Sequence, residues 1–271
     1  LYQGYALIDT PLASFAPLGG VLLVSAAAVT LAVLGVDLLQ GTRRDRLRAG
    51  ALALAIVAAG AALSLPAWTR PAGEPRSVTL VQGNIPQDMK WLLEMQQPTI
   101  DIYAELTAGE WGRDIIVWPE SAIPMFMHEA SPLLESVSDR ARESGSGFIA
   151  GIPFVMQVNG RYVYHNSVLA LGDSPGIYHK DRLVPFGEFV PLAPLLRAIA
   201  PFFSLPQFPL EGFSRGGDGQ PPLRAGGTAL ATFLCYEIVY PDYVRRHALA
   251  ADALLTVSND AWFGGSHGPH Q

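Results

Sequence analysis

The segment TALATFLCYE, residues 228–237, decides how the fold is interpreted, because it contains the only cysteine in 271 residues. Its first seven residues are uncharged and include β-branched and aromatic side chains, which predicts a buried strand. A helix-like pattern begins soon afterwards, at Tyr240-Pro241-Asp242. We therefore expect Cys235 at the carboxyl end of a strand, where a side chain is exposed and rigidly directed.

A single cysteine restricts the chemistry. It excludes an intramolecular disulfide, and the sequence has no C-x-x-C pair or Cys/His cluster at zinc spacing. The six histidines are scattered, and His267-x-x-His270 lacks a third ligand, so we expect no metal site. Two interpretations of Cys235 remain. A lone cysteine is commonly a small buried hydrophobe, and otherwise it is a nucleophile.

The composition predicts membrane helices in residues 1–69. The chain has a net charge of −6, is 49% hydrophobic and only 15% charged, and its mean hydropathy is +0.24. Residues 18–36 and 49–68 carry no charge, and each run approaches the roughly 20 residues that cross a bilayer as a helix. A basic turn at 41–48 with four arginines separates them. The alternative is a buried helical hairpin of a soluble protein, since both runs are rich in alanine.

The arginines also predict an orientation. By the positive-inside rule the 41–48 turn is cytoplasmic, so everything after Trp68 lies outside the cytoplasm. Residues 70–76, rich in Pro, Gly and charges, read as a linker into a second domain at 77–271. The chain has no initiator methionine and no closing element at Gln271. We therefore expect further spans before Leu1 and more of the second domain after Gln271.

The second domain alternates strand and helix patterns, which predicts a layered α/β fold with a mixed sheet. There is no internal repeat, phosphate loop or dinucleotide fingerprint, and we expect no nucleic-acid partner. Strands are expected at 77–82, 114–118, 147–154, 162–171, 176–179, 228–234 and 253–258, and helices at 98–109, 131–143 and 241–250.

Three of these strands end in a reactive side chain. Glu120, Lys180 and Cys235 each follow a predicted strand, and the carboxyl ends of strands are where open α/β sheets gather their chemistry. A carboxylate base, an ammonium that stabilises an oxyanion and a thiol nucleophile are sufficient for acyl transfer. The alternatives are that Glu120 caps the next element and that Lys180 belongs to a solvated turn.

The motifs around these residues resemble a known family. WPESAIP with Glu120, YHKDRLVPFGEFVP with Lys180 and CYE with Cys235 resemble the Glu-Lys-Cys triad of the nitrilase superfamily. Together with VQGNIPQDMKW and TVSNDAWFG, they are similar to the apolipoprotein N-acyltransferase family, the membrane-bound branch of that superfamily. The resemblance implies a nitrilase-like αββα sandwich outside the cytoplasm, attached to a helical bundle in a bacterial inner membrane.

The resemblance also implies a two-step reaction in lipoprotein biosynthesis. An acyl chain passes from a phospholipid, typically phosphatidylethanolamine, to the cysteine as a thioester. It then passes to the α-amino group of the diacylglyceryl-modified cysteine of an apolipoprotein. No cofactor is implied.

Further residues take roles by the same resemblance. Glu188 in PFGEF is expected to support the site by orienting Lys180, or else to be an ordinary turn carboxylate. Tyr236 and Glu237 are expected to shape the pocket. Trp91 is expected near the entrance, although a structural tryptophan is an equal alternative.

The apolar segment 191–210 suggests how a lipid substrate would enter. It carries nine large apolar side chains, one charge and five prolines, so it cannot form one continuous helix. A soluble enzyme rarely exposes so much apolar surface. We expect Phe202 and Phe203 to belong to a lid, the alternative being that the segment is ordinary core.

Two other functions use the same residues. A membrane-tethered amidase would pass the acyl group to water, and a non-enzymatic membrane receptor would keep the fold to bind a small ligand. The receptor predicts that Cys235 is inert, whereas both enzymes predict a reactive thiol.

Overall fold

A computed structural model describes residues 2–192 and 212–266. The chain divides into two compact units, one extending to Glu74 and the other covering Pro75–Ser266. Phe202 and Phe203 of the expected lid lie outside the described residues, as do His267 and His270.

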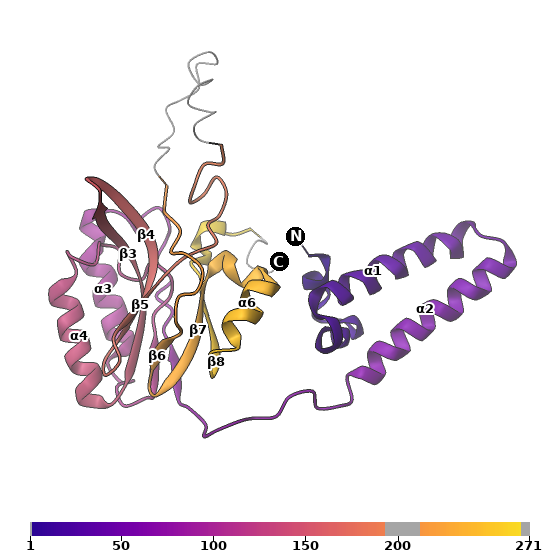
Figure 1. Cartoon of the computed structure of the whole chain (residues 1–271), viewed down its shortest axis with the longest axis horizontal. Coiled ribbons are helices and arrows are strands. Elements are labelled where there is room, and N and C mark those ends of the chain that lie inside the picture. Colours follow the sequence, from indigo (N-terminus) through magenta and orange to yellow (C-terminus); the bar gives the residue numbers. More distant parts are fainter. Residues whose placement is uncertain (1, 193–211, 267–271) are drawn as a thin grey trace, which may run out of the picture. The chain divides into compact units, whose positions relative to one another are not determined.

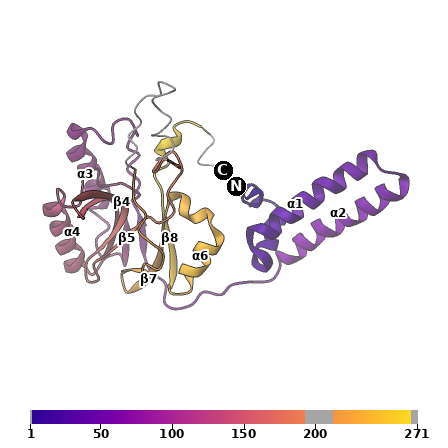
Figure 2. The same cartoon turned by 45° about the horizontal axis from the view of Figure 1, so that its top comes forward.

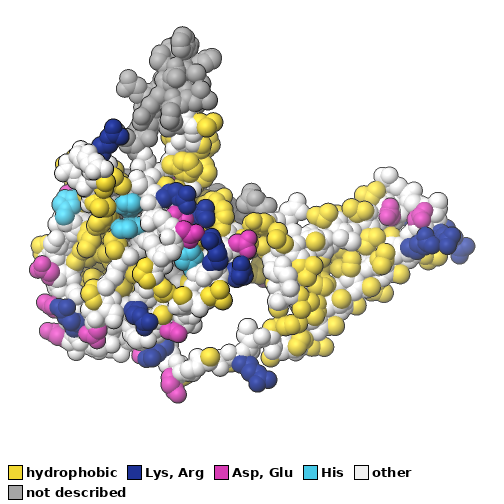
Figure 3. Space-filling view, viewed as in Figure 1, with side chains coloured by type: hydrophobic (Ala, Val, Ile, Leu, Met, Phe, Trp, Pro, Cys, Tyr) yellow, Lys and Arg dark blue, Asp and Glu magenta, His cyan; other side chains and the backbone are white. Residues whose placement is uncertain are grey.

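The first unit is a helical hairpin. Two short 3-10 helices, η1 (Gln3–Leu7) and η2 (Pro11–Phe15), precede α1 (Ala16–Gln40) and α2 (Arg43–Leu63). Both long helices are apolar and long enough to cross a membrane. Their apolar side chains are largely exposed, which argues against the buried hairpin of a soluble protein. In Figure 3 apolar side chains are spread over the visible face of this hairpin. The charged ones gather at the end where the chain passes from α1 to α2.

The prediction of a basic turn over residues 41–48 is wrong in its extent. The connection is only Gly41 and Thr42, and all four arginines lie in the first turns of α2. The reason is a capping box, in which Thr42 Oγ1 accepts from the Asp45 N–H and Asp45 accepts from the Thr42 N–H. This cap starts the helix before the apolar run begins.

The far end of the second run also differs from the prediction. We expected the span to reach Trp68, but α2 ends at Leu63. Pro66 follows closely, and a proline disfavours helical backbone at the residue before it. Trp68 instead turns back, and its indole N–H donates to the Leu63 carbonyl at 2.8 Å.

The second unit contains two sheets, and both are mixed. The first has the order β1-β2-β3-β4-β5, parallel from β1 to β3 and antiparallel from β3 to β5; the second has the order β6-β7-β8. The strands are β1 (Val78–Leu80), β2 (Ile115–Val117), β3 (Gly147–Val158), β4 (Arg161–Leu171), β5 (Gly176–His179), β6 (Leu223–Ala225), β7 (Thr228–Leu234) and β8 (Ala253–Val257). The sequence pattern missed β6, whose three residues follow two prolines.

Helices cover the outer faces of both sheets. Figures 1 and 2 show α3 (Leu93–Thr107) and α4 (Ser131–Ser144) on one side and α6 (Pro241–Ala248) on the other, with the sheets between them. This is the αββα sandwich that the resemblance implied. Helix α3 begins five residues before the predicted start at Pro98, which lies inside it.

Three apolar clusters hold the four layers together. Between α3, α4 and the first sheet, Trp118 stacks on Tyr103 with ring centroids 5.0 Å apart, and its indole donates to Thr107 at 2.8 Å. Between the sheets, Ile149 and Leu234 are fully buried. Between the second sheet and α6, Phe233 of β7 packs against Tyr243 of α6. Fully burying each large side chain contributes about 1.5 to 3 kcal/mol, so these clusters stabilise the sheets that carry the site.

Candidate active site

Glu120, Lys180 and Cys235 are brought to one edge of the sandwich. Glu120 follows β2 and Lys180 follows β5, two strands of the first sheet that run in the same direction. Cys235 follows β7 of the second sheet. The candidate site therefore lies where the two sheets meet, and not at the end of a single sheet.

Glu120 is held in a tight turn. It is 6% exposed, and its Oε1 accepts from the Asn166 amide at 2.7 Å while its Oε2 accepts from the Asn259 N–H at 2.8 Å. Gly151 of β3 allows this turn to pack closely, because a Cβ at that position would lie 2.6 Å from the Glu120 Cα. A side chain at Gly151 would displace the carboxylate.

Lys180 is buried between two carboxylates. It is 1% exposed, and its Nζ donates to Glu188 Oε1 at 2.8 Å and lies 3.9 Å from Glu120 Oε1. Glu188 also accepts from the Val184 N–H at 2.9 Å. The supporting carboxylate expected from the resemblance thus contacts the ammonium directly, and a solvated turn is excluded for Lys180.

Asn166 was missed by the sequence analysis. It is 5% exposed in β4, and its amide donates to Glu120 Oε1 at 2.7 Å and to Glu188 Oε1 at 3.0 Å. The backbone carbonyl of Asn166 accepts from the Lys180 N–H at 2.8 Å. The side chain of Asn166 therefore spaces both carboxylates, and its backbone fixes the backbone of Lys180. Asn166 comes directly before the run SVLAL, residues 167–171, and nothing in the sequence marks it apart from its being an amide in a predicted strand.

The backbone of Cys235 is strained. Its φ is +51°, in the left-handed region that residues other than glycine enter at a cost of about 1 to 3 kcal/mol. A 3-10 helix, η4 (Cys235–Val239), begins at this residue, so the chain turns sharply at the end of β7. Cys235 consequently lies at a corner at the end of the strand, where it is half-buried and not exposed as we expected.

The surroundings of the thiol act on its pKa in both directions. Burial and the nearby Glu120 charge raise the pKa of Cys235 above its ordinary value. A hydrogen bond with Ser258, the Lys180 charge and the Tyr236 backbone N–H lower it. The first group prevails, so at neutral pH the thiol keeps its proton until a base removes it.

Glu237 does not shape the pocket as expected. It is fully buried, and its carboxylate accepts from the N–H groups of Asp181 (2.7 Å), Arg182 (2.9 Å) and Leu234 (2.8 Å). The Tyr178 hydroxyl donates to it at 2.8 Å. Glu237 thus ties the residues after Lys180 to the residue before the nucleophile.

The side chain of Tyr236 also has a different place from the one expected. Its ring packs edge-to-face against Tyr240, with centroids 5.3 Å apart. It is not among the residues that line the large pocket beside the site. The contribution of Tyr236 to the site in this structure is its backbone N–H.

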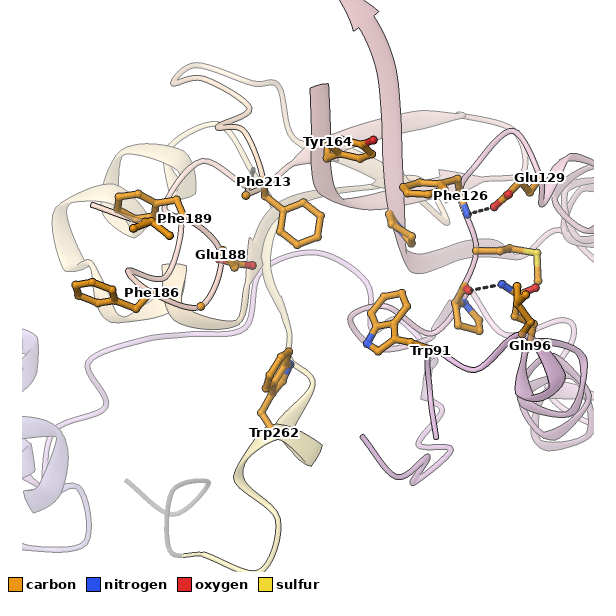
Figure 4. A pocket seen from close by; sticks show the side chains of 17 residues that line it. Trp91, Gln96, Phe126, Glu129, Tyr164, Phe186, Glu188, Phe189, Phe213 and Trp262 are labelled. Carbon is orange, nitrogen blue, oxygen red and sulfur yellow. Dashed lines mark hydrogen bonds between the residues drawn. The ribbon is translucent and has the colours of Figure 1, made fainter. Parts of the chain in front are cut away.

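A pocket of about 740 Å³ lies beside the candidate site, and Glu188 lines it. Figure 4 shows Glu188 and Phe213 on one side of this pocket and Trp91 and Phe126 on the other. The remaining aromatic lining comes from Tyr164, Phe186, Phe189 and Trp262. This volume is typical of pockets that bind small molecules, and its walls are mostly apolar. Trp91 lines this pocket, and its place near a substrate entrance stays a prediction.

In the described part of the chain no group of three or more His, Cys, Asp or Glu side chains is arranged to hold a metal ion. The site itself brings together the buried carboxylate of Glu120, the buried ammonium of Lys180 and the half-buried thiol of Cys235.

The site and the sandwich define the class of protein. Residues 77–271 match the carbon-nitrogen hydrolase family, and the chain belongs to that family. Within it, the whole chain is similar to curated apolipoprotein N-acyltransferases. It is 42% identical to the enzyme of Pseudomonas syringae pv. tomato and 43% identical to that of Vibrio cholerae serotype O1. Each match covers 100% of this chain and 54% of the relative.

The chain therefore spans about half the length of these relatives. Among solved structures, the crystal structure of a carbon-nitrogen hydrolase from Helicobacter pylori G27 is similar, with 18% identity and a TM-score of 0.44. That match covers 68% of this chain and 59% of the other.

Proposed function

We propose that the protein containing this chain transfers a fatty acyl chain from a phospholipid to the α-amino group of the diacylglyceryl-cysteine of an apolipoprotein. The observation that carries the proposal is the meeting of Glu120, Lys180 and the strained Cys235 beside an apolar pocket. The similarity to apolipoprotein N-acyltransferases supports the same activity.

In the first step Glu120 takes the thiol proton as Cys235 attacks the ester carbonyl of the donor. Lys180 and the Tyr236 N–H stabilise the negative charge that develops on the carbonyl oxygen. The C–O bond to glycerol then breaks, Glu120 returns the proton to the leaving alkoxide, and a thioester remains on Cys235. Glu188 holds Lys180 in place through the 2.8 Å hydrogen bond.

In the second step the acceptor amine attacks the thioester carbonyl. Glu120 accepts a proton from the amine, the C–S bond breaks, and the proton passes to the departing sulfur. The products are an amide and the free thiol, so the enzyme returns to its starting state. The 740 Å³ apolar pocket is the proposed place of the acyl chain in both steps.

The proposed donor is phosphatidylethanolamine, and the proposed location is a bacterial inner membrane with the catalytic unit on the periplasmic side. The support for the location is the pair of apolar helices with four arginines at one end. Labelling of Cys235 by a membrane-impermeant maleimide in intact spheroplasts tests it. Labelling only after lysis would place the thiol in the cytoplasm.

The activity is tested with labelled phosphatidylethanolamine in detergent micelles. A hydroxylamine-sensitive adduct that is absent in Cys235→Ser, and that is discharged by a diacylglyceryl lipopeptide faster than by water, is expected. An adduct discharged equally fast by water would indicate an amidase-like hydrolase. The absence of any adduct would indicate a ligand-binding module.

A further inference from the structure

Lys90 is a buried cation that the proposed reaction does not use. It is 2% exposed, although lysine is almost never fully buried unless it is paired. It belongs to the turn that begins at Pro86, whose carbonyl accepts from the N–H groups of Met89 and Lys90 at 3.2 and 3.1 Å. Trp91, the next residue, lines the apolar pocket. The turn therefore carries both a pocket residue, Trp91, and the buried ammonium of Lys90.

Lys90 contacts the backbone of Glu120, the proposed base. Its Nζ donates to the Glu120 carbonyl at 3.2 Å, and Glu120 is the charged group that acts on it. Burial lowers the pKa of the Lys90 ammonium to about 8, and the Glu120 charge opposes this shift. The ammonium is accordingly charged at neutral pH.

Among Glu120, Glu188 and Lys180 the charges balance only when Lys90 is included. The buried carboxylate of Asp181 has partners of its own in Arg182 and Arg215. The buried carboxylate of Glu237 accepts four hydrogen bonds. Glu120 and Glu188 supply two negative charges, and Lys180 supplies one positive charge. Cys235 is neutral until it reacts, and Asp88 on the turn of Lys90 is exposed to solvent. An uncompensated buried carboxylate is costly and takes up a proton instead. A second ammonium removes that tendency.

We propose that Lys90 is a positioning residue that keeps Glu120 ionised, and so able to accept the thiol proton, by supplying the second positive charge of the cluster. This inference rests on the role of Glu120 in the proposed function. It does not depend on the identity of the acyl donor or acceptor.

The test uses the single cysteine as its own reporter. The rate at which iodoacetamide alkylates Cys235 is measured from pH 4 to pH 10 in the full chain. If Glu120 assists alkylation as a base, the alkylation rate falls at low pH as Glu120 takes up a proton; this fall is the acid limb of the pH profile. Glu120→Gln should abolish the acid limb. An acid limb that survives Glu120→Gln would overturn the base assignment, and the role of Lys90 with it.

Two variants separate the charge of Lys90 from its hydrogen bond. Lys90→Gln keeps a donor for the Glu120 carbonyl and removes the charge, whereas Lys90→Arg keeps the charge. Because loss of a nearby cation raises the pKa of a carboxyl group, Lys90→Gln should move the acid limb about one pH unit higher. Below the limb its alkylation should be about tenfold slower than that of the wild type. Lys90→Arg should follow the wild type.

The pH range above the acid limb supplies an internal control. The wild type and Lys90→Gln should converge above about pH 8, where Lys90 itself loses its proton. An unshifted acid limb in Lys90→Gln, or equal shifts in the Gln and Arg variants, would overturn the proposal in favour of a packing role. Because this readout needs no lipid, a failure of phospholipid transfer would leave it intact. Thermal unfolding of each variant verifies that it is folded.

Discussion

The side-chain amide of Asn166 lies 2.7 Å from Oε1 of Glu120, and it lies within hydrogen-bond distance of Glu188 as well. The amide thus donates to both carboxylates of the site. It also keeps them apart, so that Lys180 fits between them. The geometry of the cluster therefore depends on a side chain that has no acid-base chemistry of its own.

Asn166→Ala is expected to slow formation of the acyl-enzyme by about 10- to 100-fold. The variant leaves buried charged acceptors without a donor, which costs about 1.5 to 3 kcal/mol. Intact-protein mass spectrometry after mixing with phospholipid measures the rate. Gln157→Ala, at an exposed position of β3, is the matched control. A rate within twofold of the wild type would contradict the role of Asn166.

Glu237→Gln tests the hydrogen bonds by which Glu237 links the residues after β5 to the end of β7. A glutamine amide would place donor hydrogens against backbone N–H groups that now donate to the carboxylate. We expect the free energy of unfolding to fall by about 2 to 3 kcal/mol. Chemical denaturation measures it, and Glu135→Gln on the exposed face of α4 should change it by less than about 0.5 kcal/mol. Equal effects of the two substitutions would refute the assignment.

The thiol of Cys235 should respond in opposite directions to two neighbouring substitutions. Glu120 raises the pKa of the thiol and Lys180 lowers it. Glu120→Gln should therefore move thiolate formation to lower pH, and Lys180→Met should move it to higher pH, each by about 0.5 to 1 unit. The alkaline limb of iodoacetamide alkylation reports both. Shifts of the same sign would show that the charges of these residues do not act on the sulfur directly.

The strand ends were predictable because each strand is a short apolar run closed by a polar residue. That pattern locates Glu120, Lys180 and Cys235 without any knowledge of strand pairing. The division into two sheets was not predictable in this way, since pairing of β7 with β8 joins residues whose partners no local pattern identifies. The resemblance to nitrilases supplied the sandwich instead.

The residues that support the site were harder to find, for physical reasons. Asn166 lies between His165 and Ser167 in β4, and its importance comes only from what faces it in space. Lys90 stands in the polar stretch QDMK, which reads as a solvated turn. Glu237 was singled out beside the nucleophile, but its burial depends on Tyr178 and on backbone from a distant loop.

The aromatic pocket should distinguish a lipid donor from a small one. Trp91→Ala removes a large part of its apolar wall, and loss of that contact is worth about 1 to 2 kcal/mol for a long acyl chain. Acylation by phosphatidylethanolamine should therefore slow about tenfold, and alkylation by iodoacetamide less than twofold. Leu249→Ala, at an 80% exposed position after α6, is the control. Equal losses with both reagents would indicate that Trp91 supports the thiol and not the chain.

His165 and His179 should make the folded protein sensitive to acid. Their rings lie 4.5 Å apart beside the segment that carries Lys180. Burial lowers the pKa of both, and that of His179 falls to about 4 because the His165 charge acts in the same direction. The unfolded chain binds these protons near pH 6.5 and the folded chain does not. Stability should consequently be lost as the pH falls from about 6.5 towards 4.

Thermal unfolding at half-unit pH intervals measures this loss. In His179→Gln the decline over that window should be shallower, because one of the two groups no longer takes up a proton on unfolding. His128→Gln, which replaces a histidine away from this pair, should retain the slope of the wild type. If His179→Gln kept that slope too, the acid sensitivity would have to come from other groups, and the neutral histidine pair would have no part in holding the loop of Lys180.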